Sequence, residues 1–67
     1  MSFKDFYKQK KLTQTLIAGK LKIKQQTVSR WANGESAPSL EQVKKLAEIF
    51  NVEVEIVVNL FIKSKGE

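Results

Sequence analysis

The sequence contains no cysteine and no histidine, and these two absences exclude several kinds of site. Without cysteine the chain forms no disulfide and offers no thiolate to a metal. Without histidine it lacks the commonest general base and the commonest zinc ligand. Only carboxylates remain as metal ligands, and the seven acidic residues are scattered along the chain. We therefore expect neither an enzyme nor a protein with a metal or other cofactor.

Long hydrophobic runs are also absent. No apolar stretch has the length of a membrane span, and the N-terminus lacks the basic-then-apolar pattern of a signal peptide. A chain of 67 residues is expected to form one domain, 1–67, which buries only about 60% of its unfolded surface. The sequence therefore predicts a small cytoplasmic or nuclear-type protein that does not span a membrane.

Positive charge is concentrated in the first half of the chain. The net charge is +5, but residues 1–30 carry eight Lys or Arg and one acid, whereas residues 31–67 carry four Lys and six Glu. A solvated basic surface explains this asymmetry, and so does a face that binds nucleic acid or an anionic membrane. Charge alone does not decide between these interpretations.

Five segments of helical length follow from the turn residues. Breaks at 10–11, 22, 33–38 and 51–52 leave segments at roughly 2–10, 13–21, 24–33, 39–50 and 51–63. Ser2, Thr13 and Ser39 are suited to N-cap positions, and Ser39 forms a capping-box pattern with Gln42. Asn33-Gly34 is expected to end the third segment.

The fifth segment fits two structures. Alternating Val and Glu residues suit an edge strand, whereas the spacing of Val54, Val57, Val58 and Phe61 suits a helix. We favour the helix, because a lone strand would have no partner in an otherwise helical chain.

The fold class expected is therefore all-α, a compact bundle of five short helices. Leu16, Ile17, Ala18 and Leu21 are expected to form the apolar face of segment 13–21, with Leu16 packed against the first helix. Trp31 is interpreted as a core residue, not as a platform for base stacking. The predicted core consists of Phe6, Ile17, Leu21, Val28, Trp31, Leu46 and Phe50.

Residues 14–33, QTLIAGKLKIKQQTVSRWAN, have the spacing of a helix-turn-helix. Ile17, Ala18 and Leu21 face inward from the first helix, Ile23 fills the turn, and Val28 and Trp31 face inward from the second. In this motif the second helix can enter a DNA major groove while the first crosses the backbone.

The stretch LTQTLIAGKLKIKQQTVSRWANGESAPSLEQVKKLAEIFNV resembles the Cro/C1-type (XRE-like) helix-turn-helix family. Its L-T-Q, the following Ala, V-S-R-W-A-N-G, P-S-L and L-A anchors occur in the family's order and spacing over residues 11 to about 61. The resemblance implies a lambda-repressor-like five-helix domain with a C-terminal tail at 62–67. It further implies a homodimer on a palindromic double-stranded DNA operator, acting as a Cro-like repressor in a bacterial cell or phage-infected host.

One position in the turn departs from the family pattern. Lys22 stands where the family usually has Gly. A non-glycine residue in the left-handed conformation costs roughly 1 kcal/mol.

By carry-over, Gln14 is expected to contact a phosphate, and at least one of Gln25 and Gln26 to read adenine. Arg30 shares their face and either reads guanine or clamps a phosphate. Asn33 either contacts a phosphate or caps its helix. The full set of predicted DNA-binding residues is Thr13, Gln14, Lys22, Lys24, Gln25, Gln26, Thr27, Ser29, Arg30 and Asn33.

The fifth segment has more apolar residues than one helix face can bury. Val57, Val58, Phe61 and Ile62 are therefore predicted to form a dimer or partner interface, with an oversized core as the simpler explanation. The partner is either a second copy or another protein. An alternative function follows, in which the domain binds a repressor or a toxin as an anti-repressor or antitoxin.

Overall fold

Residues 2–62 are described by the computed structural model, and within this range the chain forms five helices and no strand. The helices are α1 (Phe3–Gln9), α2 (Gln14–Leu21), α3 (Gln25–Ala32), α4 (Leu40–Phe50) and α5 (Val54–Phe61). The all-α prediction is confirmed, and so is the preference for a helix in the fifth segment. The predicted tail at 62–67 lies outside the described residues, except for Ile62.

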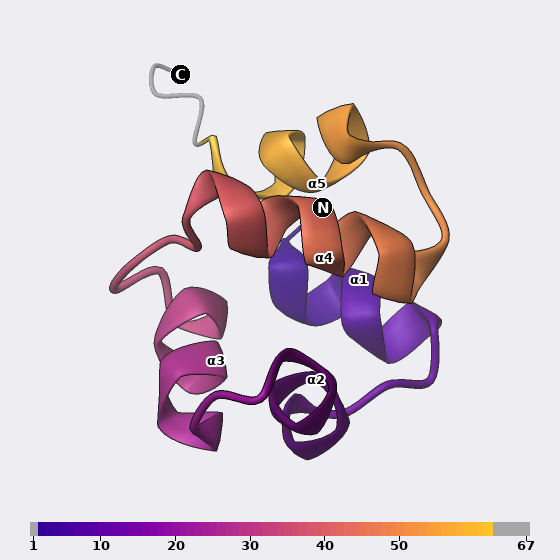
Figure 1. Cartoon of the computed structure of the whole chain (residues 1–67). Coiled ribbons are helices and arrows are strands. Elements are labelled where there is room, and N and C mark those ends of the chain that lie inside the picture. The colour runs from indigo at the N-terminus through magenta and orange to yellow at the C-terminus, as the bar shows by residue number, and fades with distance from the viewer. Residues whose placement is uncertain (1, 63–67) are drawn as a thin grey trace.

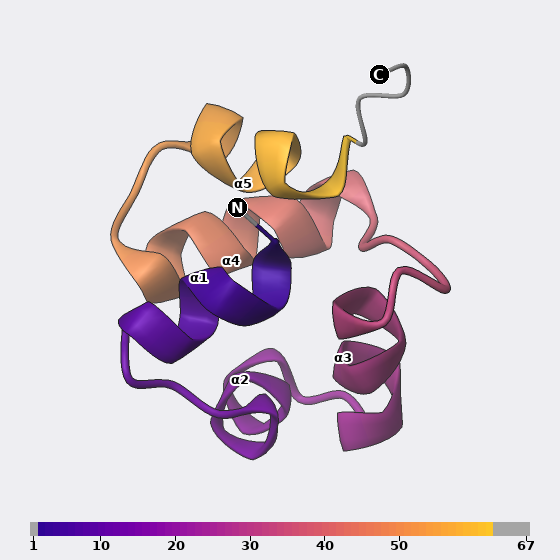
Figure 2. The ribbon, with the colours of Figure 1, turned by 180° about the vertical axis from the view of Figure 1, so that it is seen from behind.

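The helix-turn-helix lies at one end of the molecule. Helices α2 and α3 pack against each other there, while α4 and α5 form a hairpin at the other end, with α1 between the two pairs (Figure 1). The view from behind shows the same order (Figure 2). Because α4 also contacts α2, and α1 contacts α3, the motif is held against the remainder of the domain.

The helices begin where local side-chain chemistry predicts. The backbone N–H of Asp5 donates to Ser2 Oγ at 3.1 Å, and that of Leu16 donates to Thr13 Oγ1 at 3.2 Å. Ser39 and Gln42 form a reciprocal capping box that starts α4. Each bond satisfies an amide that would otherwise lack a partner in the first turn of its helix.

Four helices end in the same hydrogen-bond pattern. A residue with a left-handed backbone follows each of α1, α2, α3 and α4. The N–H of the next residue donates to the carbonyl five positions earlier, as Ile23 N–H does to Ala18 O at 3.0 Å. This is the Schellman motif, which normally places glycine at the left-handed position. Here only α3 uses glycine, Gly34 with φ of 78°; the other positions are Lys11, Lys22 and Asn51.

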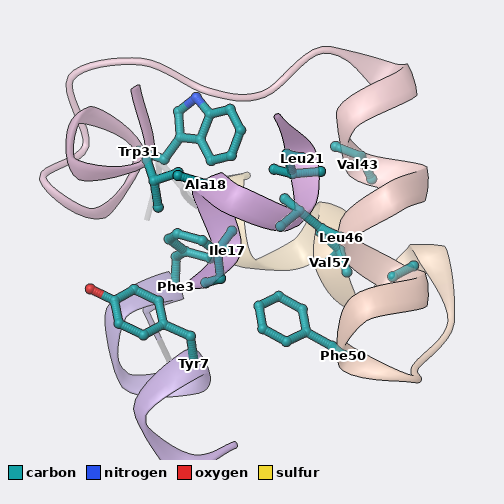
Figure 3. Close-up of a cluster of buried hydrophobic side chains, with 12 residues drawn as sticks. Phe3, Tyr7, Ile17, Ala18, Leu21, Trp31, Val43, Leu46, Phe50 and Val57 are labelled. Atoms are coloured by element: carbon teal, nitrogen blue, oxygen red, sulfur yellow. The ribbon is translucent and has the colours of Figure 1, made fainter. Parts of the chain in front are cut away.

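Twelve buried side chains form the core, and all five helices contribute (Figure 3). They are Phe3, Tyr7, Ile17, Ala18, Leu21, Val28, Trp31, Val43, Leu46, Ala47, Phe50 and Val57. The assignment of Trp31 to the core is confirmed. The prediction for α1 was wrong in one detail, because Phe6 is only partly buried against Phe50, whereas Phe3 and Tyr7 are fully enclosed.

Leu16 does not complete the apolar face of α2, contrary to the expectation. Its side chain is 50% exposed, while Ile17, Ala18 and Leu21 are buried. The buried face of α2 is therefore narrow, and Leu16 lies on its solvent side.

Lys22 has φ of 60° and ψ of 46°, so it carries the predicted left-handed strain. We expect Lys22→Gly to be more stable than Lys22→Ala by about 1 kcal/mol, because both remove the same charge and only glycine relieves the backbone. Urea unfolding of the two variants measures the difference. An alanine variant as stable as the glycine variant would show that no strain is stored at this turn.

Candidate nucleic-acid interface

One side of α3 is buried and the other is free. Val28 and Trp31 fix the helix to the core, with Thr27 and Ala32 partly buried beside them. Residues on the opposite arc, at 25, 26, 29, 30 and 33, point away from the core because a helix turns by 3.6 residues. Gln25, Gln26, Arg30 and Asn33 are exposed, and Ser29 is half-buried.

The N-terminal ends of α2 and α3 are adjacent. Gln14 is the first residue of α2 and Gln25 the first of α3, and Gln25 Nε2 donates to Gln14 Oε1 at 3.4 Å. This contact places the starts of the two helices next to each other. The positive ends of α2 and α3 therefore lie close together.

The charges around those helix ends differ from those elsewhere in the fold. Helices α1, α4 and α5 each have an acid in the first turn, namely Asp5, Glu41 and Glu55. Helices α2 and α3 have none. Lys24 is the N-cap residue of α3, and its side chain makes no hydrogen bond to the first amides of the helix. A surface of this kind suits phosphate.

Three of the remaining predicted contact residues lie beside these two helix ends, and Asn33 lies at the other end of α3. Lys22 and Lys24 are exposed in the turn between α2 and α3. Thr13 is exposed and uses its hydroxyl as the N-cap of α2. Asn33 is exposed and occupies the C-cap position of α3, where its backbone N–H donates to Ser29 O at 2.9 Å.

Tyr7 was missed as part of this site. Its hydroxyl accepts a hydrogen bond from Gln14 Nε2 at 3.0 Å, and the sequence analysis assigned it no role. The sequence could have indicated this contact, because the hydroxyl of a buried tyrosine usually has a hydrogen-bond partner.

The apolar surface predicted at the C-terminus is only partly available. Val57 has no exposed surface, so it attaches α5 to the core and cannot contact a partner. Phe61 is partly buried and packs against Phe3, with ring centroids 4.9 Å apart. Val58 is half-buried, whereas Ile62 is 61% exposed.

Beside Ile62 an open groove of about 710 Å³ runs between the end of α3 and the end of α5. Phe3, Trp31 and Phe61 contribute to its lining, and so do polar residues such as Asn33 and Asn59. Besides this groove and Ile62, the described part of α5 leaves Val54 and Ile56 exposed.

Comparison with protein families identifies the fold. A helix-turn-helix family model (HTH_3) matches residues 3–57, which include all of α1 to α4 and the start of α5. The chain belongs to the helix-turn-helix family. This match confirms the resemblance to Cro/C1-type proteins. The general function of this helix-turn-helix protein is that of a DNA-binding transcription regulator.

Neither the curated proteins nor the solved structures gave a significant match to this helix-turn-helix protein. Among residues 2–62, no helix has both the length and the apolar character that crossing a membrane requires.

Proposed function

We propose that this chain is a Cro-like repressor that binds a specific double-stranded DNA operator and excludes polymerase from it. The observation that carries the proposal is the contact between Gln14 and Gln25, which brings together the starts of two helices without first-turn acids. Phosphate oxygens approach such a surface favourably, and the exposed side of α3 is then next to the bases.

The size of α3 fits a major groove. An α-helix with its side chains is about 10–12 Å across, and the groove is about 12 Å wide, so α3 can enter it. Gln25 and Gln26 have the donor and acceptor needed to pair with adenine, and the guanidinium of Arg30 can pair with guanine O6 and N7. Lys22 and Lys24 contact the phosphates on either side and supply affinity that depends on salt.

We propose further that two copies bind a palindromic site. The domain measures 33 Å in its longest dimension, close to the ~34 Å that separates half-sites one helical turn apart. Two adjoining copies of this size are compatible with α3 helices in successive major grooves. Exposed Ile62 and the partly buried Val58 and Phe61 are the surface that we assign to the contact between copies.

A second candidate function is binding to a repressor or toxin through the same C-terminal surface. The open groove between α3 and α5, which mixes aromatic and polar side chains, favours it. The loop at Glu35, Ser36 and Ala37 also favours it, because an acid and two uncharged residues add no phosphate contact there. In this alternative the domain binds DNA weakly or not at all.

Selection from random duplex DNA at two salt concentrations tests the proposed function. We expect a palindromic sequence to be enriched at both concentrations, with lower overall affinity at the higher one because phosphate contacts release counterions. Absence of any enriched sequence at low salt would contradict operator binding and favour the protein-binding alternative.

Arg30 is expected to determine one base pair of the operator. Arg30→Ala should cost about 1–3 kcal/mol of binding free energy on the selected duplex and should relax the preference at one position. Arg30→Lys is the matched control, because it keeps the charge but not the planar pair of donors. Base reading predicts that lysine does not restore the preference. If lysine restores the affinity and alanine weakens binding equally on all sequences, Arg30 contacts phosphate instead.

Ile62→Asp is expected to shift the protein from dimer to monomer, because it places a charge on the exposed part of the proposed interface. Ile62 is a better site than Phe61, whose contact with Phe3 also stabilises the fold. Sedimentation equilibrium over a range of concentrations measures the change, and Leu16→Asp, at an exposed leucine of α2, is the control. Identical association of both variants and the unchanged protein would remove Ile62 from the interface.

A further inference from the structure

Tyr7 lies on α1, outside the helix-turn-helix, and yet it is bonded to the first residue of that motif. Its side chain is 4% exposed, and its hydroxyl accepts from Gln14 Nε2 at 3.0 Å. Gln14 Oε1 in turn accepts from Gln25 Nε2 at 3.4 Å. A continuous chain of hydrogen bonds therefore connects a core residue of α1 with the first residue of α3.

The position of Tyr7 is fixed from several sides. Its ring packs edge-on against Phe3, with centroids 5.1 Å apart, and Figure 3 shows the hydroxyl at the outer edge of the core cluster. Its carbonyl accepts the N–H of Leu12 at 2.9 Å in the turn that ends α1. The phenol oxygen is thus a hydrogen-bond partner in a fixed position, which a solvent-exposed side chain would not be.

The two hydrogen bonds as they stand correspond to one orientation of each amide. A glutamine amide has two N–H donors and one oxygen, so an N–H of Gln14 directed to Tyr7 turns its oxygen towards Gln25. That oxygen takes one N–H of Gln25. The second N–H and the oxygen of Gln25 remain free, and these are the two groups that pair with adenine N7 and N6.

We propose that Tyr7 is a positioning residue for DNA recognition, acting through Gln14 on the amide of Gln25. This inference rests on the proposed function, and it adds a residue from outside the two helices that face DNA. Without the hydroxyl, the Gln14 amide loses the fixed partner that holds it beside Gln25, and the amide of Gln25 is then less well ordered. Loss of the hydroxyl therefore lowers both affinity and the preference for adenine.

The test compares Tyr7→Phe with the unchanged full chain on the selected duplex. We expect binding to weaken about 2- to 10-fold, the equivalent of one hydrogen bond, while the ring and its contact with Phe3 are retained. The discrimination against a duplex in which the Gln25-dependent base pair is replaced should fall as well. Phe6→Leu is the control, because it alters packing on the same helix without touching a hydroxyl; discrimination by this variant should not change.

A double-mutant cycle separates the proposed route from general destabilisation. In a Gln14→Ala background, Tyr7→Phe is expected to have no further effect on DNA affinity, because the hydroxyl acts only through Gln14. An equal loss in both backgrounds would overturn the proposal. Urea unfolding of each variant establishes that only folded protein is compared.

A measurement without DNA distinguishes failure of this inference from failure of the proposed function. Tyr7→Phe should shift the side-chain amide NMR signals of both Gln14 and Gln25 in the free protein. Unmoved signals would refute the hydrogen-bond chain even if the protein binds DNA. Shifted signals together with no selective DNA binding by the unchanged protein would refute the proposed function and, with it, the role of Tyr7 in recognition.

Discussion

Burial of Trp31 and Val28 determines which side of α3 the protein presents. Both side chains are enclosed by residues from other helices, and Trp31 packs near Phe3 and Phe61 at centroid distances of 6.3 and 6.4 Å. An eight-residue helix is not stable alone in water, so this packing is required for α3 to exist. Because one side of α3 is buried, the opposite side, with Gln25, Gln26 and Arg30, is exposed.

The charges at the N-terminal ends of the helices favour one kind of partner for this surface. Acids in the first turns of α1, α4 and α5 compensate the positive ends of those helices within the protein. In α2 and α3 the same ends carry no such acid and lie together, next to Lys22 and Lys24. A partner with negative charge is the complement that these two ends lack.

Sequence reasoning predicted the elements that depend on local chemistry. The caps at Ser2, Thr13 and Ser39 involve residues three positions apart, and their hydrogen bonds were predictable for that reason. The strain at Lys22 was predictable as well, because the motif requires a left-handed residue at that position. The residue spacing of α5 fitted a strand as well as a helix, and the helix was preferred because a lone strand would have no partner strand.

The errors concern how the helices pack. Whether Phe3 or Phe6 points inward depends on the rotation of α1 against α3 and α4, and the spacing of the aromatic residues permits either choice. Val57 was assigned to a surface because α5 is apolar on several sides, but contact with the core takes precedence there. The bond between Tyr7 and Gln14 joins residues of two helices and depends on where α1 crosses α2, which no local pattern specifies.

Titration of isotope-labelled protein with the selected duplex, followed by backbone amide NMR, tests most directly whether the joined starts of α2 and α3 form the DNA-binding surface. The account predicts that the largest shifts fall on Thr13, Gln14 and residues 22–30, with small shifts in α5 apart from those caused by dimer formation. Shifts concentrated in α5 and in the groove beside it, with α3 unaffected, would contradict it.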